Sequence, residues 1–462
     1  MKGFLQRVAA PGLRRNSAMA GIQALVSIVS LFGAYKLLLW HEGTDALGIW
    51  SLVGAYAVAI RLLDVSGSAT IGRFVAVAEQ GKAPFAAARY IDTGLLVLVL
   101  LYTFLALIIW APLAWLIDVQ LPPEKAHIAA QLLPLTLIGL VANVTAASST
   151  DALDGIGRAD IRGMLMIAGY ALMLACAAVL IPTMGLSGLA LAQIIQFLAV
   201  LGGSRVLLVR HISGLRSIPR APDAKIIKEL VSYGSRIQLA SLANFLTDPL
   251  AKVLLAHLGG LPSVASYELA SKIVIQARTI LVSAAMPLIP VFAKSERLSD
   301  PNVMAIIGRA NRWLFPLIGA MIVGVCLAGP FVSLIMLGTV NSQLVLLIVL
   351  LSAGYGLNMV SLFVYLHAQA VGRLKWNIIG QFSIGLTMMA GTFCFSALFG
   401  PYAVPLSFAI GLVLSSMLFL YGNLNREKVR LWKVLPHPLI AVIPLCSIIL
   451  SGVACYLYLH SS

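Results

Sequence analysis

The sequence predicts an all-α polytopic membrane protein, built from two pseudo-symmetric six-helix lobes and one additional C-terminal span. Two observations predict this class. Of the 462 residues, 60% are hydrophobic and only 11% are charged, whereas a soluble protein carries roughly a quarter charged residues. In addition, the same charged residues recur inside apolar segments about 215 residues later, as expected for two homologous halves.

Thirteen apolar runs are predicted to cross the membrane, because about 20 apolar residues span the roughly 30 Å of hydrocarbon. They cover residues 17–40, 46–66, 92–117, 127–150, 163–182, 184–204, 232–257, 263–292, 313–337, 343–371, 376–397, 401–423 and 435–459. The first residues are not expected to form a cleavable signal peptide, since Arg14 and Arg15 interrupt a short apolar stretch.

The basic residues place the N-terminus on the cytoplasmic side. Apart from Lys125 and five basic residues inside spans, the Lys and Arg residues fall in segments predicted to face the cytoplasm. The opposite face carries Glu42, Asp45, Asp118 and Glu124. The net charge of +15 therefore indicates topology and attraction to anionic lipid headgroups, and no soluble basic domain exists to bind nucleic acid.

An internal repeat predicts the two lobes. The aligned positions are Lys36 and Lys252, His41 and His257, Gly43 and Gly259, Arg61 and Arg278, Gly157–Arg158 and Gly372–Arg373, and Gly185 and Gly400. Because each half begins and ends on the cytoplasmic side, the halves are expected to be parallel repeats, as in transporters that rock two lobes around a central site. The predicted domains are an N-lobe (1–209), a cytoplasmic linker with an interfacial helix (210–231), a C-lobe (232–424) and an extra C-terminal span (425–462).

Five basic residues are expected inside spans, where each charge costs a few kcal/mol and needs a use. They are Lys36, Arg61, Lys252, Lys272 and Arg278. One interpretation is a cationic substrate-binding cavity, because arginine binds phosphate groups bidentately. The other is structural ion pairing or snorkelling to the headgroup layer, which suits Lys36 and Lys252 near the predicted outer boundary.

The seventh and eighth spans carry the candidates for ion coupling. Asn244 and Asp248 share one helical face with Lys252. Asp248 is expected either to respond to H⁺ or Na⁺, or to form a plain i,i+4 pair with Lys252. In the eighth span Glu268 precedes Lys272 by one helical turn, and these two are expected to form an internal ion pair.

No enzymatic or metal-binding motif accompanies these residues. The sequence contains no Walker loop, no GxSxG and no HExxH. We therefore predict a transporter rather than an enzyme, with no catalytic residue, no metal site and no cofactor other than H⁺ or Na⁺ as a coupling ion. The five cysteines lie in predicted spans without a CxxC pair, and we assign them to packing.

Two short segments resemble a Gly-Arg signature that closes the fourth and tenth helices of polysaccharide flippases. They are residues 151–158, which end in Arg158, and residues 367–375, which contain Arg373. Residues 230–238 are similar to the opening of the second lobe in the same proteins. Together with the repeat, the chain resembles the multidrug/oligosaccharidyl-lipid/polysaccharide (MOP) superfamily, and within it the Wzx-type flippases. The resemblance implies that Arg158 and Arg373 belong to a cytoplasmic gate.

The resemblance further implies alternating access in the bacterial inner membrane. The implied cargo is an undecaprenyl-diphosphate-linked oligosaccharide, an O-antigen or exopolysaccharide repeat unit, moved from the cytoplasmic to the periplasmic leaflet. Arg61 and Arg278 would hold the diphosphate. A polysaccharide polymerase and a chain-length regulator are the implied partners, besides membrane lipids. One alternative is a multidrug and toxic compound extruder that exchanges organic cations for H⁺ or Na⁺, and another is a non-transporting scaffold for glycan assembly.

Overall fold

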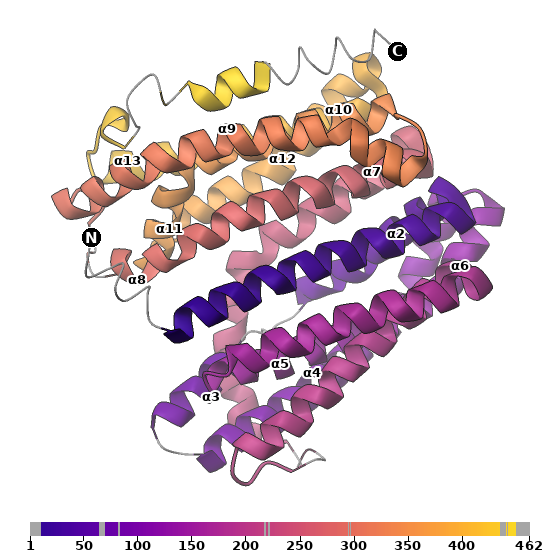
Figure 1. The fold of residues 1–462 in the computed structure, drawn as a ribbon, viewed down its shortest axis with the longest axis vertical. Helices are drawn as coiled ribbons and strands as arrows, with labels where there is room; N and C mark the ends of the chain where they lie inside the picture. The colour runs from indigo at the N-terminus through magenta and orange to yellow at the C-terminus, as the bar shows by residue number, and fades with distance from the viewer. Residues whose placement is uncertain are drawn as a thin grey trace. The chain divides into compact units, whose positions relative to one another are not determined.

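The computed structural model describes residues 11–63, 70–81, 84–216, 219, 222–293, 295, 297–434, 440 and 442–449. Helices make up nearly all of this described part, and no β-strand occurs in it (Figure 1). The predicted fold class, an all-α polytopic membrane protein, is confirmed.

The chain forms two compact units, Met1–Leu242 and Ala243–Ser462, and the border between them falls inside helix α7. The helices that precede this border are α2 (Pro11–Ala59), η1 (Ile60–Leu63), α3 (Thr70–Gln80), α4 (Pro84–Gln120), α5 (Pro123–Gly155) and α6 (Ala159–His211). The remaining helices are α7 (Ala224–Ala285), η2 (Met286–Leu288), α8 (Ile289–Phe292), α9 (Pro301–Leu337), α10 (Ser342–Asn358), η3 (Met359–Ser361), α11 (Leu362–Ala370), α12 (Lys375–Phe399), η4 (Gly400–Tyr402), α13 (Ala403–Arg426) and η5 (Leu431–Lys433).

Seven helical stretches among the described residues are long and apolar enough to cross a membrane. They are Gly21–Val58, Phe85–Gln120, Pro123–Gly155, Ala159–His211, Pro301–Leu337, Ser342–Ala370 and Lys375–Arg426. Ala159–His211 and Lys375–Arg426 each contain two consecutive predicted spans, and Gly21–Val58 contains most of the first and part of the second. The seventh predicted span and most of the eighth lie in α7. Most of the thirteenth predicted span lies outside the described residues, with a short helical piece at 443–449.

Glycines with positive φ join consecutive spans and follow the internal repeat. Gly43 (φ 80°) and Gly260 (φ 67°) kink α2 and α7, and Gly185 (φ 55°) and Gly400 (φ 53°) join the fifth span to the sixth and the eleventh to the twelfth. Glycine adopts this left-handed region without a steric penalty. The sequence alignment of Gly43 with Gly259 is therefore one residue off, because the residue that adopts the kinked conformation is Gly260.

The linker between the lobes differs from the prediction in one respect. Residues 224–231 are helical, as expected, but they are the first turns of α7 and not a separate interfacial helix. Helix α3, which is described, is short and amphipathic, since it buries Ile71 and Val75 and exposes Arg73. That residues 224–231 lie on the membrane surface stays a prediction.

Helix α3 crosses α5 at two glycines that allow the backbones to touch. A Cβ atom on Gly72 would lie 2.6 Å from the carbonyl oxygen of Asp151, and one on Gly155 would lie 2.5 Å from the carbonyl oxygen of Gly72. Contacts this short are incompatible with any side chain, and the opposing atoms are backbone. The crossing therefore depends on both glycines.

Replacing Gly72 with alanine is expected to destabilise the protein by about 1–3 kcal/mol, because the new methyl group overpacks this crossing. Gly54→Ala is the matched control, since a Cβ at Gly54 in α2 would meet nothing within 4 Å. Alanine there should be neutral or mildly stabilising, through its higher helix propensity. Thermal unfolding in detergent compares the two variants, and equal melting temperatures would contradict the close crossing.

Candidate functional site

The reversal of α7 at Gly260 brings Lys252 and Glu268 together. These residues lie equally far before and after the kink, and their Nζ and Oε2 atoms are 2.8 Å apart. In a straight helix a separation of 16 residues would place them roughly 24 Å apart at 1.5 Å per residue. The contact thus requires the two halves of α7 to run back along each other, with Gly260 and Pro262 at the turn.

The pair is the centre of a row of four alternating charges, which we call the charge ladder: Asp248, Lys252, Glu268 and Lys272. Asp248 Oδ2 is 2.7 Å from Lys252 Nζ, and Lys272 Nζ is 3.5 Å from Glu268 Oε1. The outer side chains, Asp248 and Lys272, are 44% and 36% exposed, whereas the inner ones are 6% and 4% exposed. The ladder is therefore buried in the middle and open at both ends.

The burial of Lys252 corrects one alternative from the sequence. Lys252 does not snorkel to the headgroup layer, because its ammonium group lies between two carboxylates and its side chain is 6% exposed. A buried ammonium is tolerated when it is paired and hydrogen-bonded, so the two carboxylates explain its position. The i,i+4 pairs allowed by the sequence, Asp248–Lys252 and Glu268–Lys272, both form. Asn244 was the third candidate for ion coupling, and its side chain lies outside the described part of the structure.

Lys252 would keep a counter-ion if the charge of Asp248 were removed. Glu268 Oε2 lies 2.8 Å from Lys252 Nζ, although Glu268 also pairs with Lys272. If Glu268 were protonated instead, Lys272 would lose the one carboxylate that pairs with it among the described residues. Asp248 is also the more exposed acid, so it is the carboxylate best placed to exchange a proton or a cation with its surroundings.

Arg278 lies further along the second half of α7 and contacts an aromatic ring. Its guanidinium carbon is 5.5 Å from the ring centroid of Tyr355, which in turn packs edge-on against Phe408. No acidic side chain pairs with Arg278 in the described part of the chain, and its buried Nε atom has no hydrogen-bond partner there. A cation held by an aromatic face keeps its charge available to an anion.

The basic candidates of the first repeat lie in the first unit. Lys36 is half-buried in α2. Arg61 lies in η1 and donates a hydrogen bond from Nη2 to Oδ1 of Asn143 in α5, over 3.0 Å. Since Lys252, Lys272 and Arg278 belong to the second unit, a single cationic cavity formed by all five residues stays a prediction.

The Gly-Arg signatures make equivalent contacts in the two repeats. Gly157 and Gly372 have φ values of 76° and 73°, and each is followed by the signature arginine. Arg158 contacts Nε2 of His211 over 2.7 Å, at the end of α6. Arg373 pairs with Glu427, the residue that follows α13. Each arginine thus ties the start of the fifth helix of its repeat to the end of the sixth, and a gating role stays a prediction.

Sequence reasoning missed a buried ion pair in the first unit. Arg205 was expected in a cytoplasmic loop, but it lies in α6, 8% exposed, and donates to Oδ1 of Asp92 over 2.6 Å. The same guanidinium contacts the carbonyl oxygen of Arg216, and Tyr90 donates to Glu229 over 2.5 Å. These contacts link Arg216 to α6 and Glu229 to α4. The available signal was a lone aspartate at the start of the third apolar run.

The described residues contain no group of three or more His, Cys, Asp and Glu side chains arranged to hold a metal ion. The four cysteines in this part are free, namely Cys176, Cys326, Cys394 and Cys446, and Cys455 lies outside it.

The sequence matches no protein-family model and no curated protein. The structure resembles solved transporters. A multidrug resistance MATE family transporter of the MOP superfamily, in its inward-facing conformation, matches with a TM-score of 0.75 and 15% identity over 88% of this chain and 98% of its own. An outward-facing MATE structure matches with a TM-score of 0.63 and 17% identity over 90% and 95% of the two chains.

A third solved structure is a MOP superfamily transporter from Pyrococcus furiosus, described as having a binding pocket of reverse polarity. It matches with a TM-score of 0.66 and 16% identity, covering 90% of this chain and 95% of its own. Likenesses at this level of identity establish the fold and leave the cargo open. The MOP-type fold expected from the sequence is confirmed, whereas the narrower Wzx-type resemblance is not supported by these structures. The chain therefore has the fold of MATE transporters of the MOP superfamily.

Proposed function

We propose that this protein is a secondary active transporter of the multidrug-exporter type, which exchanges organic cations for protons across a bacterial inner membrane. The observation that carries the proposal is the charge ladder. Asp248 presents an exposed carboxylate, while the buried Lys252–Glu268 pair behind it remains balanced whether or not Asp248 is protonated. The MATE fold supports the same function class by analogy.

Exchange follows from competition for one carboxylate. The four charges of the ladder sum to zero when Asp248 is ionised, and an organic cation can then pair with its exposed oxygen. Proton uptake gives the ladder a net positive charge and removes the counter-ion, so the cation is released. A proton and an organic cation that bind in turn to Asp248 would be carried in opposite directions by a two-state transporter.

A second candidate function is the flipping of a lipid-linked oligosaccharide, with a glycan polymerase and a chain-length regulator as partners. Arg278 favours it, because this arginine is held by Tyr355 and has no acidic partner among the described residues. A diphosphate is a suitable ligand for such a guanidinium. Lys36 and Arg61 would add positive charge from the first repeat.

Reconstituted vesicles distinguish the two functions. The purified protein is placed in liposomes with an acidic lumen, and uptake of a fluorescent organic cation is followed after dilution into neutral buffer. The proposal expects uptake that collapses when a protonophore dissipates the gradient. A Na⁺ gradient in place of the pH gradient tests the other coupling ion. If neither gradient drives uptake while a fluorescent undecaprenyl-diphosphate oligosaccharide changes leaflet, the flippase is the function.

Arg278→Gln is expected to separate the candidates within one protein. Exchange of organic cations should persist, because Arg278 is not part of the charge ladder, whereas oligosaccharide flipping should fall to the level of empty vesicles through loss of the phosphate contact. Arg309→Gln is the matched control, since Arg309 is an exposed residue of α9. Normal flipping by Arg278→Gln would contradict a role of this guanidinium in binding a diphosphate.

A further inference from the structure

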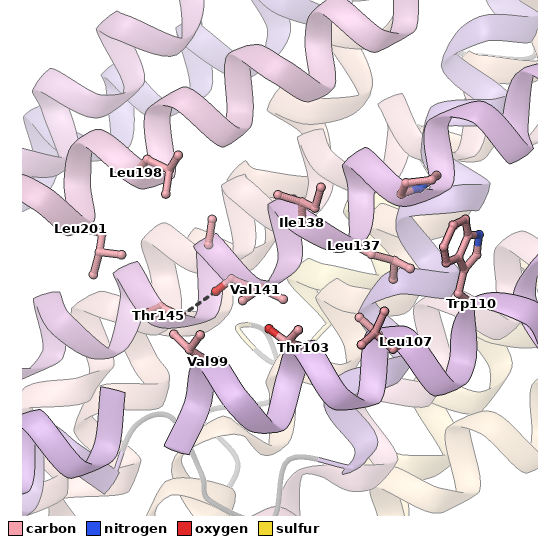
Figure 2. Close-up of a pocket in the computed structure, with 13 residues that line it drawn as sticks. Val99, Thr103, Leu107, Trp110, Leu137, Ile138, Val141, Thr145, Leu198 and Leu201 are labelled. Atoms are coloured by element: carbon pink, nitrogen blue, oxygen red, sulfur yellow. Dashed lines mark hydrogen bonds between the residues drawn. The ribbon is translucent and has the colours of Figure 1, made fainter. Parts of the chain in front are cut away.

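An apolar groove lies in the first unit between helices α4, α5 and α6. It has a volume of about 450 Å³ and is lined by residues 99–110 of α4, residues 134–145 of α5, and Leu198 and Leu201 of α6 (Figure 2). This volume lies within the roughly 300–1,000 Å³ of small-molecule binding sites. The groove is separate from the charge ladder, which belongs to α7.

The groove runs along α4 and α5, because one stripe of residues on each of these helices lines it. The lining residues of α4 recur every three or four positions from Val99 to Trp110, and those of α5 do the same from Pro134 to Thr145. Each stripe covers eleven residue steps, or about 17 Å at 1.5 Å per residue. A site with this length suits an extended chain better than a compact ring system.

The walls offer almost nothing to a polar ligand. Besides the indole of Trp110, their polar side-chain atoms are the hydroxyls of Thr103 and Thr145. The Thr145 hydroxyl is already satisfied, because it donates to the carbonyl oxygen of Val141 over 2.7 Å (Figure 2). No charged residue lines the groove. A phosphate or an ion therefore finds no charged partner here, and a sugar finds few hydrogen-bonding groups.

The groove opens onto a surface that a membrane would cover. Leu107 and Ile138 in its walls are 64% and 54% exposed, and outside it α4 continues with exposed Phe104 and Ile108. Both stripes lie in the middle portion of helices long and apolar enough to cross the bilayer. The groove is thus at the depth of lipid chains and not of headgroups.

We propose that this groove binds one acyl chain of a membrane phospholipid. Lipid chains are as apolar as the walls, so the hydrophobic effect does not favour a chain inside the groove over one in the bulk bilayer. The preference comes from shape complementarity and dispersion contacts. An empty groove would forfeit those contacts along its whole length. An extended chain entering from the bilayer restores them, and its headgroup stays at the membrane surface.

Photolabelling tests the proposal on the full-length protein in nanodiscs. The probe is a phosphatidylethanolamine with a diazirine in one acyl chain, and labelled peptides are mapped by mass spectrometry. Labels are expected on residues 134–145 and 99–110. Ala142→Phe, which fills the groove from α5, should reduce labelling of Thr145, a lining residue that is only 3% exposed, to the level measured without light. Ala111→Phe, at an exposed position of α4 outside the lining, should leave it unchanged.

Ala106→Phe fills the groove from the opposite wall and serves if Ala142→Phe does not fold. Persistent labelling of Thr145 in a folded groove-filling variant would overturn the proposal. So would an equal loss in Ala111→Phe, which would indicate a general change in lipid contact. Labelling by a polyprenyl-chain probe in place of the acyl probe, or a cross-linked second copy at these peptides, would assign the groove to another occupant and reject the acyl chain.

Discussion

Lys252→Met is expected to lower the free energy of unfolding by about 3–5 kcal/mol, since removal of one member of a buried ion pair leaves the other charge uncompensated. Glu268 is the residue left behind, and its side chain is 4% exposed. Lys272 remains 3.5 Å away and compensates part of this charge, which places the expected loss near the lower end of that range. Reversible unfolding in detergent or bicelles measures the change.

The double variant Lys252→Met/Glu268→Gln should recover most of this loss, because it removes both buried charges together. Lys272→Met is the matched control, since its side chain is 36% exposed and its contact with Glu268 is longer, at 3.5 Å. A cost below about 1 kcal/mol is expected for such a partly solvated pair. If the double variant were as unstable as Lys252→Met, the instability would come from lost lysine packing and not from an uncompensated carboxylate.

Asp248→Asn is expected to uncouple transport from the proton gradient while the protein remains folded. A pH difference of one unit supplies about 1.4 kcal/mol per proton, enough for a roughly tenfold concentration ratio of a cargo exchanged one-for-one. The variant cannot take up the proton, so an organic cation should reach only equal concentrations on both sides. The measurement is the steady-state distribution of the cation in acid-loaded vesicles.

A measurement of thermal stability distinguishes the loss of proton coupling in Asp248→Asn from misfolding. The Asp248→Asn substitution is not expected to disturb the buried pair, because Lys252 keeps Glu268 at 2.8 Å, so the melting temperature should stay close to that of the unaltered protein. Glu268→Gln is a useful comparison, since it removes the buried carboxylate but leaves Asp248 in place. Accumulation that still follows the pH gradient in Asp248→Asn would reject Asp248 as the exchange group, whatever the cargo.

The fold class was predictable because membrane insertion constrains composition so strongly. Apolar runs long enough to span the bilayer identified the helices, and the recurrence of Gly185 at Gly400 identified the repeat, since both positions require a left-handed backbone. The residue of the second repeat that corresponds to Gly43 could not be predicted exactly. Gly259 and Gly260 are adjacent, and the sequence alone does not indicate which of them adopts a positive φ.

Two of the three contacts in the charge ladder were predictable from the sequence. The contacts Asp248–Lys252 and Glu268–Lys272 follow from helical spacing, which places residues four apart on one face. The contact that joins them, Lys252 to Glu268, depends on the reversal of α7, and neither residue's neighbours in sequence indicate it. The Asp92–Arg205 pair was missed for the same reason, because its partners come from different helices and meet only after packing.

The reversal at Gly260, which brings Lys252 and Glu268 together, favours one order in which these two residues could be lost during evolution. Loss of Glu268 first leaves Lys252 with Asp248, and Lys272 is exposed enough to be solvated, so that step is survivable. Loss of Lys252 first leaves the buried carboxylate of Glu268 with the longer contact to Lys272 as its compensation. Related chains should therefore include sequences that keep Lys252 without Glu268, and few that keep Glu268 without Lys252.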